Sequence, residues 1–122
     1  MSTMMKRRAG GDSEIEKKFA QGQRLQARER YDDAESRYRK VLAVNPAHIG
    51  ALTGLTQCLI AAKREGDAVG VLDRAAKDAG EDLHYMFDLA GLCASVKHTA
   101  RARSLYERVL ERDPDNVATL LN

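Results

Sequence analysis

The chain has 122 residues, with 20 Lys and Arg against 18 Asp and Glu, two Cys, no Trp and 43% hydrophobic residues. A chain of this length forms one domain with enough apolar residues for a core, without disulfides or a structural metal. The net charge of +2 is too small, and the two signs are too interleaved, for nucleic acid or a membrane surface to be the expected partner. The low cysteine count, without metal-ligand spacing, predicts a reducing, cytoplasmic compartment.

Residues 1–12 are expected to form a disordered basic N-terminal tail. The cluster Lys6-Arg7-Arg8 is typical of the start of a signal peptide, but Ala9-Gly10-Gly11-Asp12 follows where an apolar stretch of roughly 7–15 residues is required. The sequence therefore predicts no export signal. No run approaches the roughly 18 apolar residues of a membrane span, and the tail lacks the periodicity that would predict order.

An internal repeat organises the rest of the chain. Asn45-Pro46 and Asp113-Pro114 are separated by 68 residues, which is twice 34. With a period of 34, counted from Ile15, the blocks 15–48, 49–82 and 83–116 align without a gap. A small residue at position 20 and a large one at position 24 recur in every block: Ala34 with Tyr38, Ala68 with Leu72, and Ala102 with Tyr106. Such recurrence predicts a repeat protein.

Each block is predicted to contain two amphipathic helices, because apolar residues recur at three- and four-residue spacing on both sides of a central break. The helices are expected at about 13–28, 31–44, 48–62, 66–78, 82–95 and 99–112. Asn45 is expected to cap the helix that follows it, with Pro46 in its first turn. Gly80 is expected to end the second helix of the middle block. One helical hairpin cannot bury its own apolar face, so the units must stack.

The chain ends in Val117-Ala118-Thr119-Leu120-Leu121-Asn122, which opens an apolar helix and stops within two turns. Solenoids usually close with a helix whose outer face is polar. Residues 117–122 are therefore expected to be the start of a truncated capping helix or of a fourth repeat. Two explanations stay open: the chain is a fragment of a longer protein, or its apolar end pairs with another copy.

These columns resemble the tetratricopeptide repeat (TPR) family, whose 34-residue helix-turn-helix unit has Trp-x2-Leu-Gly-x2-Tyr, Ala-x3-Phe and Pro elements. The resemblance covers residues 15–116, and its best-matched parts are Gly22-x2-Leu25, Ala34-x3-Tyr38 and Pro46, then Ala102-x3-Tyr106 and Pro114. The chain departs from the pattern at Lys18 in the Trp column, at Gln21 in the Leu column and at Gly80 in the Pro column. The resemblance implies an all-α fold, a right-handed α-solenoid of three TPR-like repeats with six helices and the short start of a seventh.

In this family the first helix of each repeat lines a concave groove that holds an extended peptide or a partner helix. Carried over by position, the resemblance implies a partner-binding groove made of Phe19, Gln23, Gln26, Thr53, Gln57, Ile60, His84, Phe87 and Asp88. Phe19 and Phe87, the only Phe residues, are either anchors for a partner or packed against a neighbouring repeat. Gln23 and Gln57 are expected to hydrogen-bond a peptide backbone.

A subset of the family binds the acidic carboxyl-terminal tails of chaperones through a two-carboxylate clamp of Lys, Asn and Arg side chains. At the clamp positions this chain has Phe19, Gln23, Gly54, His84 and Asp88. An Asp in the place of an Arg would repel a carboxylate. The clamp is therefore absent from the sequence, and no tight binding to free acidic chaperone tails is expected.

No catalytic, cofactor or metal site is expected. Cys58 and Cys93 occupy columns where small apolar residues pack, which predicts inert buried thiols, and no two of the three His share a helix face at metal-ligand spacing. The predicted function is a protein-protein interaction module without enzymatic activity. Two alternatives stay open: the N-terminal recognition or oligomerisation segment of a larger multidomain enzyme, and a self-associating structural protein whose apolar end caps the next copy.

Overall fold

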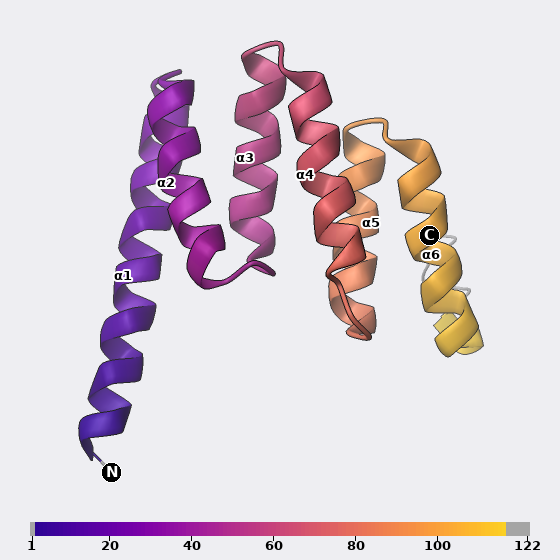
Figure 1. Cartoon of the computed structure of the whole chain (residues 1–122), viewed down its shortest axis with the longest axis horizontal. Helices are drawn as coiled ribbons and strands as arrows, with labels where there is room; N and C mark the ends of the chain where they lie inside the picture. The colour runs from indigo at the N-terminus through magenta and orange to yellow at the C-terminus, as the bar shows by residue number, and fades with distance from the viewer. Residues whose placement is uncertain (1, 117–122) are drawn as a thin grey trace. The chain divides into compact units, whose positions relative to one another are not determined.

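The computed structural model describes residues 2–116 of the chain, with side chains described from residue 13 to residue 115. Over this range the chain forms six α-helices and one short 3-10 helix, and no strand (Figure 1). The elements are α1 (Ser2–Ala27), α2 (Tyr31–Val44), α3 (Ile49–Ala61), α4 (Glu65–Lys77), α5 (Leu83–Ser95), α6 (Thr99–Arg112) and η1 (Pro114–Asn116). The predicted all-α, helical-repeat fold class is confirmed.

The 34-residue period is visible in the helix boundaries. Starts of second helices and ends of first helices advance in steps of 34: Tyr31, Glu65 and Thr99, and Ala27, Ala61 and Ser95. Apart from the start of α1, every helix begins and ends within one residue of its predicted position. The spacing of the repeat, rather than any single motif, is therefore what locates the helices.

The turn between the two helices of each repeat is a Schellman motif. In the first repeat the N–H of Arg30 donates to the carbonyl of Leu25 at 2.9 Å, and Glu29 has a left-handed φ of 61°. The other repeats form the same bond and the same turn: Arg64 to Leu59 at 2.7 Å with Lys63 at a φ of 62°, and His98 to Cys93 at 2.8 Å with Lys97 at a φ of 64°. The left-handed position is thus filled three times without a glycine.

The chain folds as two compact units, Met1–Ala68 (unit 1) and Val69–Asn122 (unit 2). In unit 1, α2 packs against both α1 and α3. The Tyr38 ring of α2 lies between two glycines: an added Cβ would come within 2.8 Å of its Cε1 at Gly22 of α1, and within 2.3 Å of its Cζ at Gly54 of α3. The large residue at position 24 therefore fills the space between the first two repeats.

In unit 2, α5 and α6 pack against each other. The buried face of α6 has the three- and four-residue spacing of one helix face: Ala102, Leu105 and Val109. Gly80, expected to end the helix before it, has a left-handed φ of 65°. The guanidinium of Arg108 donates to the carbonyl of Ala76 in the last turn of α4 at 3.2 Å and to that of Gly80 in the connection after it at 3.1 Å, which ties α6 to the end of α4.

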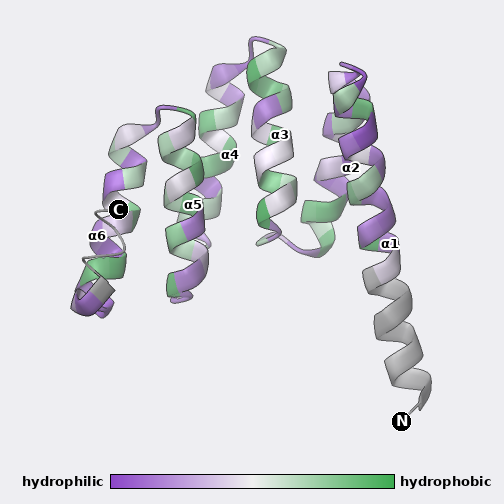
Figure 2. Cartoon of the chain, turned by 180° about the vertical axis from the view of Figure 1, so that it is seen from behind, coloured by the Kyte–Doolittle hydropathy of each residue, from purple (hydrophilic) through white to green (hydrophobic). Residues whose placement is uncertain are grey.

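The helices carry both hydrophobic and hydrophilic residues, as Figure 2 shows. This mixture is typical of helices that bury one face and expose the other. None of the helices within residues 2–116 is both long enough and apolar enough to cross a membrane. α1 has the length, with 26 residues, but it includes charged residues throughout.

The first helix begins earlier than predicted. α1 starts at Ser2 rather than near residue 13, so residues 2–12, expected to form a disordered tail, belong to this helix. No proline precedes Pro46, and Gly10 and Gly11 each cost a helix only about 1 kcal/mol, which weakens the helix without ending it. The helix expected at 117–122 lies outside the described residues.

The residue that caps α3 also differs from the prediction. Asn45 follows α2, and its Oδ1 accepts from the N–H of Ala47 at 3.3 Å in a turn. The cap of α3 is instead His48, whose Nδ1 accepts from the N–H of Ala51 at 3.0 Å. Pro46 therefore lies in the connection between repeats, because the side chain of Asn45 turns the chain before the helix starts.

Candidate partner-binding surfaces

The structure divides the predicted groove residues between the two units. Those on α1 and α3 lie together in unit 1 and define the α1/α3 surface: Phe19, Gln23, Gln26, Thr53, Gln57 and Ile60. Those on α5 lie in unit 2 and define the α5 surface: His84, Phe87 and Asp88. Because α1 and α3 are in contact, side chains of the first two repeats can act jointly on the α1/α3 surface.

A chain of side-chain hydrogen bonds, the Tyr38 relay, links the core of unit 1 to the α1/α3 surface. The Tyr38 hydroxyl donates to Gln26 Oε1 at 2.6 Å, and Gln26 Nε2 donates to Gln57 Oε1 at 2.8 Å. Burial, with a smaller effect of Cys58, raises the pKa of Tyr38 to about 12, so the hydroxyl keeps its proton and remains a donor. Because the Gln57 carbonyl is occupied, the NH2 group of this exposed side chain is left to bind another molecule.

Phe19 packs largely inside unit 1. Its ring centroid lies 4.7 Å from that of His48 and 6.0 Å from that of Tyr38. An added Cβ at Gly50 would come within 2.7 Å of Phe19 Cζ, so the ring also fills a space left by a glycine of the second repeat. Phe19 is partly buried, and most of its contacts are with its own and the neighbouring repeat, as expected if the ring packs within the chain and does not anchor a partner.

The other residues of the α1/α3 surface differ in exposure. Gln23 is exposed, whereas Thr53 and Ile60 are partly buried. Thr53 Oγ1 donates to the carbonyl of Ile49 in its own helix at 2.8 Å, so its hydroxyl proton is already used. Of the two glutamines predicted to bind a peptide backbone, Gln57 is the one that a neighbouring side chain orients.

The α5 surface combines an aromatic pair with a weak ion pair. The Phe87 ring lies 5.7 Å from the Tyr106 ring in an edge-to-face arrangement, in the columns of Phe19 and Tyr38. His84 Nε2 lies 3.6 Å from Asp88 Oδ2, and the two side chains are 90% and 40% exposed. An exposed pair of this kind contributes little to stability, so both polar groups are accessible to a partner.

Neither cysteine has the environment of a reactive thiol. Cys58 and Cys93 are 1% and 0% exposed. Burial raises the pKa of both thiols to about 11, with smaller contributions from Glu35 to Cys58 and from Asp73 to Cys93. Reactive cysteines need a lowered pKa and exposure. Among the residues with described side chains, no three His, Cys, Asp or Glu lie where they could hold a metal ion together.

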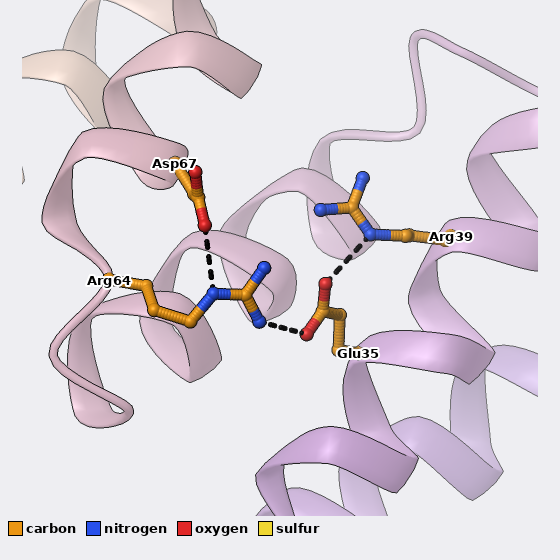
Figure 3. Close-up of polar contacts among 4 residues, drawn as sticks. All are labelled: Glu35, Arg39, Arg64 and Asp67. Atoms are coloured by element: carbon orange, nitrogen blue, oxygen red, sulfur yellow. Dashed lines mark hydrogen bonds and ion pairs between the residues drawn. The ribbon is translucent and has the colours of Figure 1, made fainter.

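An arginine network joins the two repeats of unit 1 (Figure 3). Glu35 accepts from Arg39 Nε at 2.9 Å and from Arg64 Nη1 at 2.7 Å. Arg64 Nε also donates to Asp67 Oδ2 at 2.8 Å. Burial alone would raise the pKa of Glu35, but the hydrogen bonds and charges of the two arginines lower it. The network ties the turn before α4 to α2, and its charges neutralise one another, so its role is structural.

The bond between Gln26 and Tyr38 was not predicted, although Gln26 was assigned to the groove. A signal was present in the column at position 24, where the middle repeat has Leu72 and the first has Tyr38. Tyrosine, which the third repeat also has at this position as Tyr106, brings a hydroxyl into the packed interior, and a buried hydroxyl needs a hydrogen-bond partner. The sequence does not say which neighbouring helix supplies it.

The repeat has a counterpart among known protein families. A family model described as tetratricopeptide repeat matches residues 25–93, which is more than half of the 122 residues. The matched range runs from the end of α1, through the middle repeat, into α5. A search of curated proteins gave no match.

Proposed function

This chain belongs to the tetratricopeptide repeat family, and from that premise we propose that it binds segments of protein partners, with the α1/α3 surface of unit 1 and the α5 surface of unit 2 each acting as a binding surface. Repeats of this family generally mediate protein-protein interaction and are typically not catalytic. The proposed ligand is an extended peptide or a helix, and no cofactor takes part in its binding.

The observation that carries this proposal is the Tyr38 relay. An extended peptide presents a carbonyl oxygen at every residue, and the NH2 group of Gln57 is a donor for such an oxygen. Because Gln26 holds Gln57 by a bond of 2.8 Å, Gln57 loses less conformational freedom on binding than a free side chain would. Gln23, exposed one turn before Gln26 on α1, supplies a second amide for the same ligand.

The two phenylalanines are proposed to add apolar contacts. Each ring is partly buried and is held by an aromatic neighbour from the second helix of its own repeat, Tyr38 for Phe19 and Tyr106 for Phe87. A ring held in this way can bury its remaining exposed edge against a partner at low entropic cost. The exposed polar groups of His84 and Asp88 would then select among partners by the charges that the partners carry at this surface.

The proposed ligand is not a free acidic chaperone tail. Gly54 supports this exclusion, because it stands where the clamp has an Asn. Any side chain at Gly54 would start within 2.3 Å of the Tyr38 ring, which is only 1% exposed and has no room to withdraw. The relay tyrosine and the clamp asparagine therefore exclude each other, and Asp88 adds a repulsive charge.

The proposal is tested with peptides selected from a random library on the immobilised full chain. Their affinities for the wild type and for Gln57→Glu are compared by fluorescence polarisation. The introduced carboxylate can still accept the bond from Gln26, but it has no NH2 donor for a peptide carbonyl. We expect the affinity to fall by about tenfold, with an unchanged circular dichroism spectrum.

The matched control is Ser36→Glu, which adds the same charge at an exposed position of α2 outside the α1/α3 surface. Its affinity for the selected peptides should equal that of the wild type. Phe87→Ala tests the α5 surface in the same assay and should weaken those peptides that reach it. Selected peptides that bind Gln57→Glu and Phe87→Ala as well as the wild type would show that the ligand lies elsewhere.

A further inference from the structure

Three arginines line one hollow formed by α1, the turn after it and α2 in unit 1. The hollow, called the arginine hollow below, is lined by Gln21, Arg24, Leu25, Arg28 and Arg37. Leu25 and Arg37 are partly buried, and the other residues are exposed. None of the residues of the α1/α3 surface lines it, so it is a second, chemically different surface of the same unit.

The charges of the arginine hollow are not neutralised within the described part of the chain. None of the ion pairs between described side chains includes any of its three arginines. Glu35 of α2 pairs with Arg39 and Arg64, and Asp33, one turn before Arg37, pairs with Arg30 at 2.7 Å. Lys40, one turn after Arg37, adds a further positive charge. Like charges gathered in one place repel one another, and a bound anion would relieve that repulsion.

The other repeats show that arginine is not what the fold requires here. Apolar residues stand at the positions of the later repeats that correspond to Gln21, Arg24, Arg28 and Arg37. They are Leu55, Cys58, Ala62 and Val71 in the second repeat, and Leu89, Leu92, Val96 and Leu105 in the third. Five of these eight residues are buried. In the first repeat the corresponding residues line a hollow instead, and contact with water requires only that such a face be polar. A face with both acidic and basic side chains would meet that requirement. In this hollow, every charged residue in the lining is an arginine.

We propose that the arginine hollow binds the phosphate group of a phosphorylated serine or threonine in a protein partner. A phosphate monoester carries a charge of about −1.5 to −2 and three oxygens that accept hydrogen bonds. Guanidinium groups bind such oxygens in bidentate pairs, and three arginines line the hollow. A single carboxylate would neutralise one arginine and leave two. Leu25 provides an apolar contact for the residue beside the phosphorylated one.

A nucleic acid fits the arginine hollow less well as the source of phosphate. Each backbone phosphodiester carries a single charge, and affinity comes from many phosphates spread along a basic surface. The net charge of this chain is only +2. The hollow also has no aromatic side chain on which a base could stack. The geometry therefore favours one localised dianion on a peptide.

The test uses the full chain and a fluorescein-labelled peptide with a central phosphoserine between two leucines and an amidated carboxyl terminus. The same peptide with serine or glutamate at the centre gives the comparison, at about 50 mM and about 200 mM salt. We expect the phosphopeptide to bind at least about tenfold more tightly than either. The variant Arg24→Gln/Arg28→Gln/Arg37→Gln should lose at least about tenfold in affinity for it.

The matched control removes three exposed cations of unit 2: Arg74→Gln, Lys77→Gln and Arg103→Gln. This control and Gln57→Glu should leave phosphopeptide binding within about twofold of the wild type, and the hollow variant should still bind the library-selected peptides. Equal losses in both triple variants would overturn the proposal, because the attraction would then be unspecific. Equal affinity for the serine and phosphoserine peptides, or tighter binding of a single-stranded oligonucleotide, would overturn it too.

A measurement on the wild type alone keeps the test decisive if the hollow variant does not fold. Inorganic phosphate should displace the labelled phosphopeptide, whereas chloride at the same ionic strength should not. Displacement by phosphate and chloride to the same extent would contradict a phosphate site, because it would reflect screening only.

Discussion

Gly54→Ala is expected to destabilise the chain, although alanine is the better helix former. Gly54 lies inside α3, where this change normally stabilises by about 1 kcal/mol. Here the new methyl group would lie 2.3 Å from Cζ of Tyr38 and 2.7 Å from its hydroxyl oxygen. The ring cannot move aside, because it is 1% exposed and Gly22 of α1 lies so near it on the other side that an added Cβ there would come within 2.8 Å of the ring.

The expected size of the effect follows from three contributions. Overpacking a core costs about 1–3 kcal/mol, and pushing the hydroxyl away from Gln26 costs about 1 kcal/mol more. The gain in helix propensity offsets about 1 kcal/mol, so the free energy of unfolding should fall by about 2 kcal/mol. Urea unfolding followed by circular dichroism measures it. Gly70→Ala is the matched control, because an added Cβ there meets nothing within 4 Å, and it should stabilise by about 1 kcal/mol.

A second change separates the clash from other effects of alanine. Tyr38→Leu places in the first repeat the residue that the middle repeat has at the same position, Leu72. Alone it should destabilise by leaving a cavity, but in Gly54→Ala the new methyl group fills part of that space. The double variant should therefore be at least about 1 kcal/mol more stable than the sum of the single changes. Additive changes, or equal effects of Gly54→Ala and Gly70→Ala, would refute this account of the packing.

Lys97→Gly is expected to stabilise by about 1 kcal/mol, because the φ of Lys97 is 64°, whereas Lys40→Gly inside α2 should destabilise by a similar amount in urea unfolding. Hydrogen bonds with His98 and Arg101 hold the pKa of Asp73 below its usual value of 3.8. Its stabilising contribution is therefore present above about pH 4 and is lost as the pH falls through the lowered pKa, so Asp73→Asn should flatten the pH dependence of the melting temperature below about pH 4. Both cysteines should react with iodoacetamide only as fast as the chain opens, and rapid labelling of the folded protein would contradict their burial.

The positions of the helices could be predicted because they depend on local spacing. Every hairpin must bury the same kind of face, so apolar columns recur every 34 residues and fix five complete helices to within one residue. The left-handed turns could not be predicted in this way. Glu29, Lys63 and Lys97 carry no glycine signal, and their positive φ values of 61°, 62° and 64° are imposed by the Schellman bonds and by the helix that follows.

The candidate surfaces were predictable only in part. The family resemblance assigned Gln26 and Gln57 to one groove, but their bond depends on how α1 and α3 approach, which no local pattern records. The arginine hollow was missed for the same reason, because Arg24 lies on α1, Arg28 in the turn after it and Arg37 on α2. Contacts between helices depend on how the helices pack. From the sequence, packing can be inferred only from the size and polarity of the residues that recur at each repeat position.

The three repeats allow each of these columns to be compared within one chain. Position 20 is small and at most 4% exposed in every repeat, so it specifies the fold and says nothing about a partner. Positions 10, 14 and 23 are free of charge in the later repeats and become Arg24, Arg28 and Arg37 in the first. Gln26 stands in a column that holds Ile60 and Ala94 in the later repeats, and it passes the hydrogen bond of Tyr38 on to Gln57. In both cases the residue that departs from its column leads to a surface that the fold itself does not need, and those departures are where recognition should be sought.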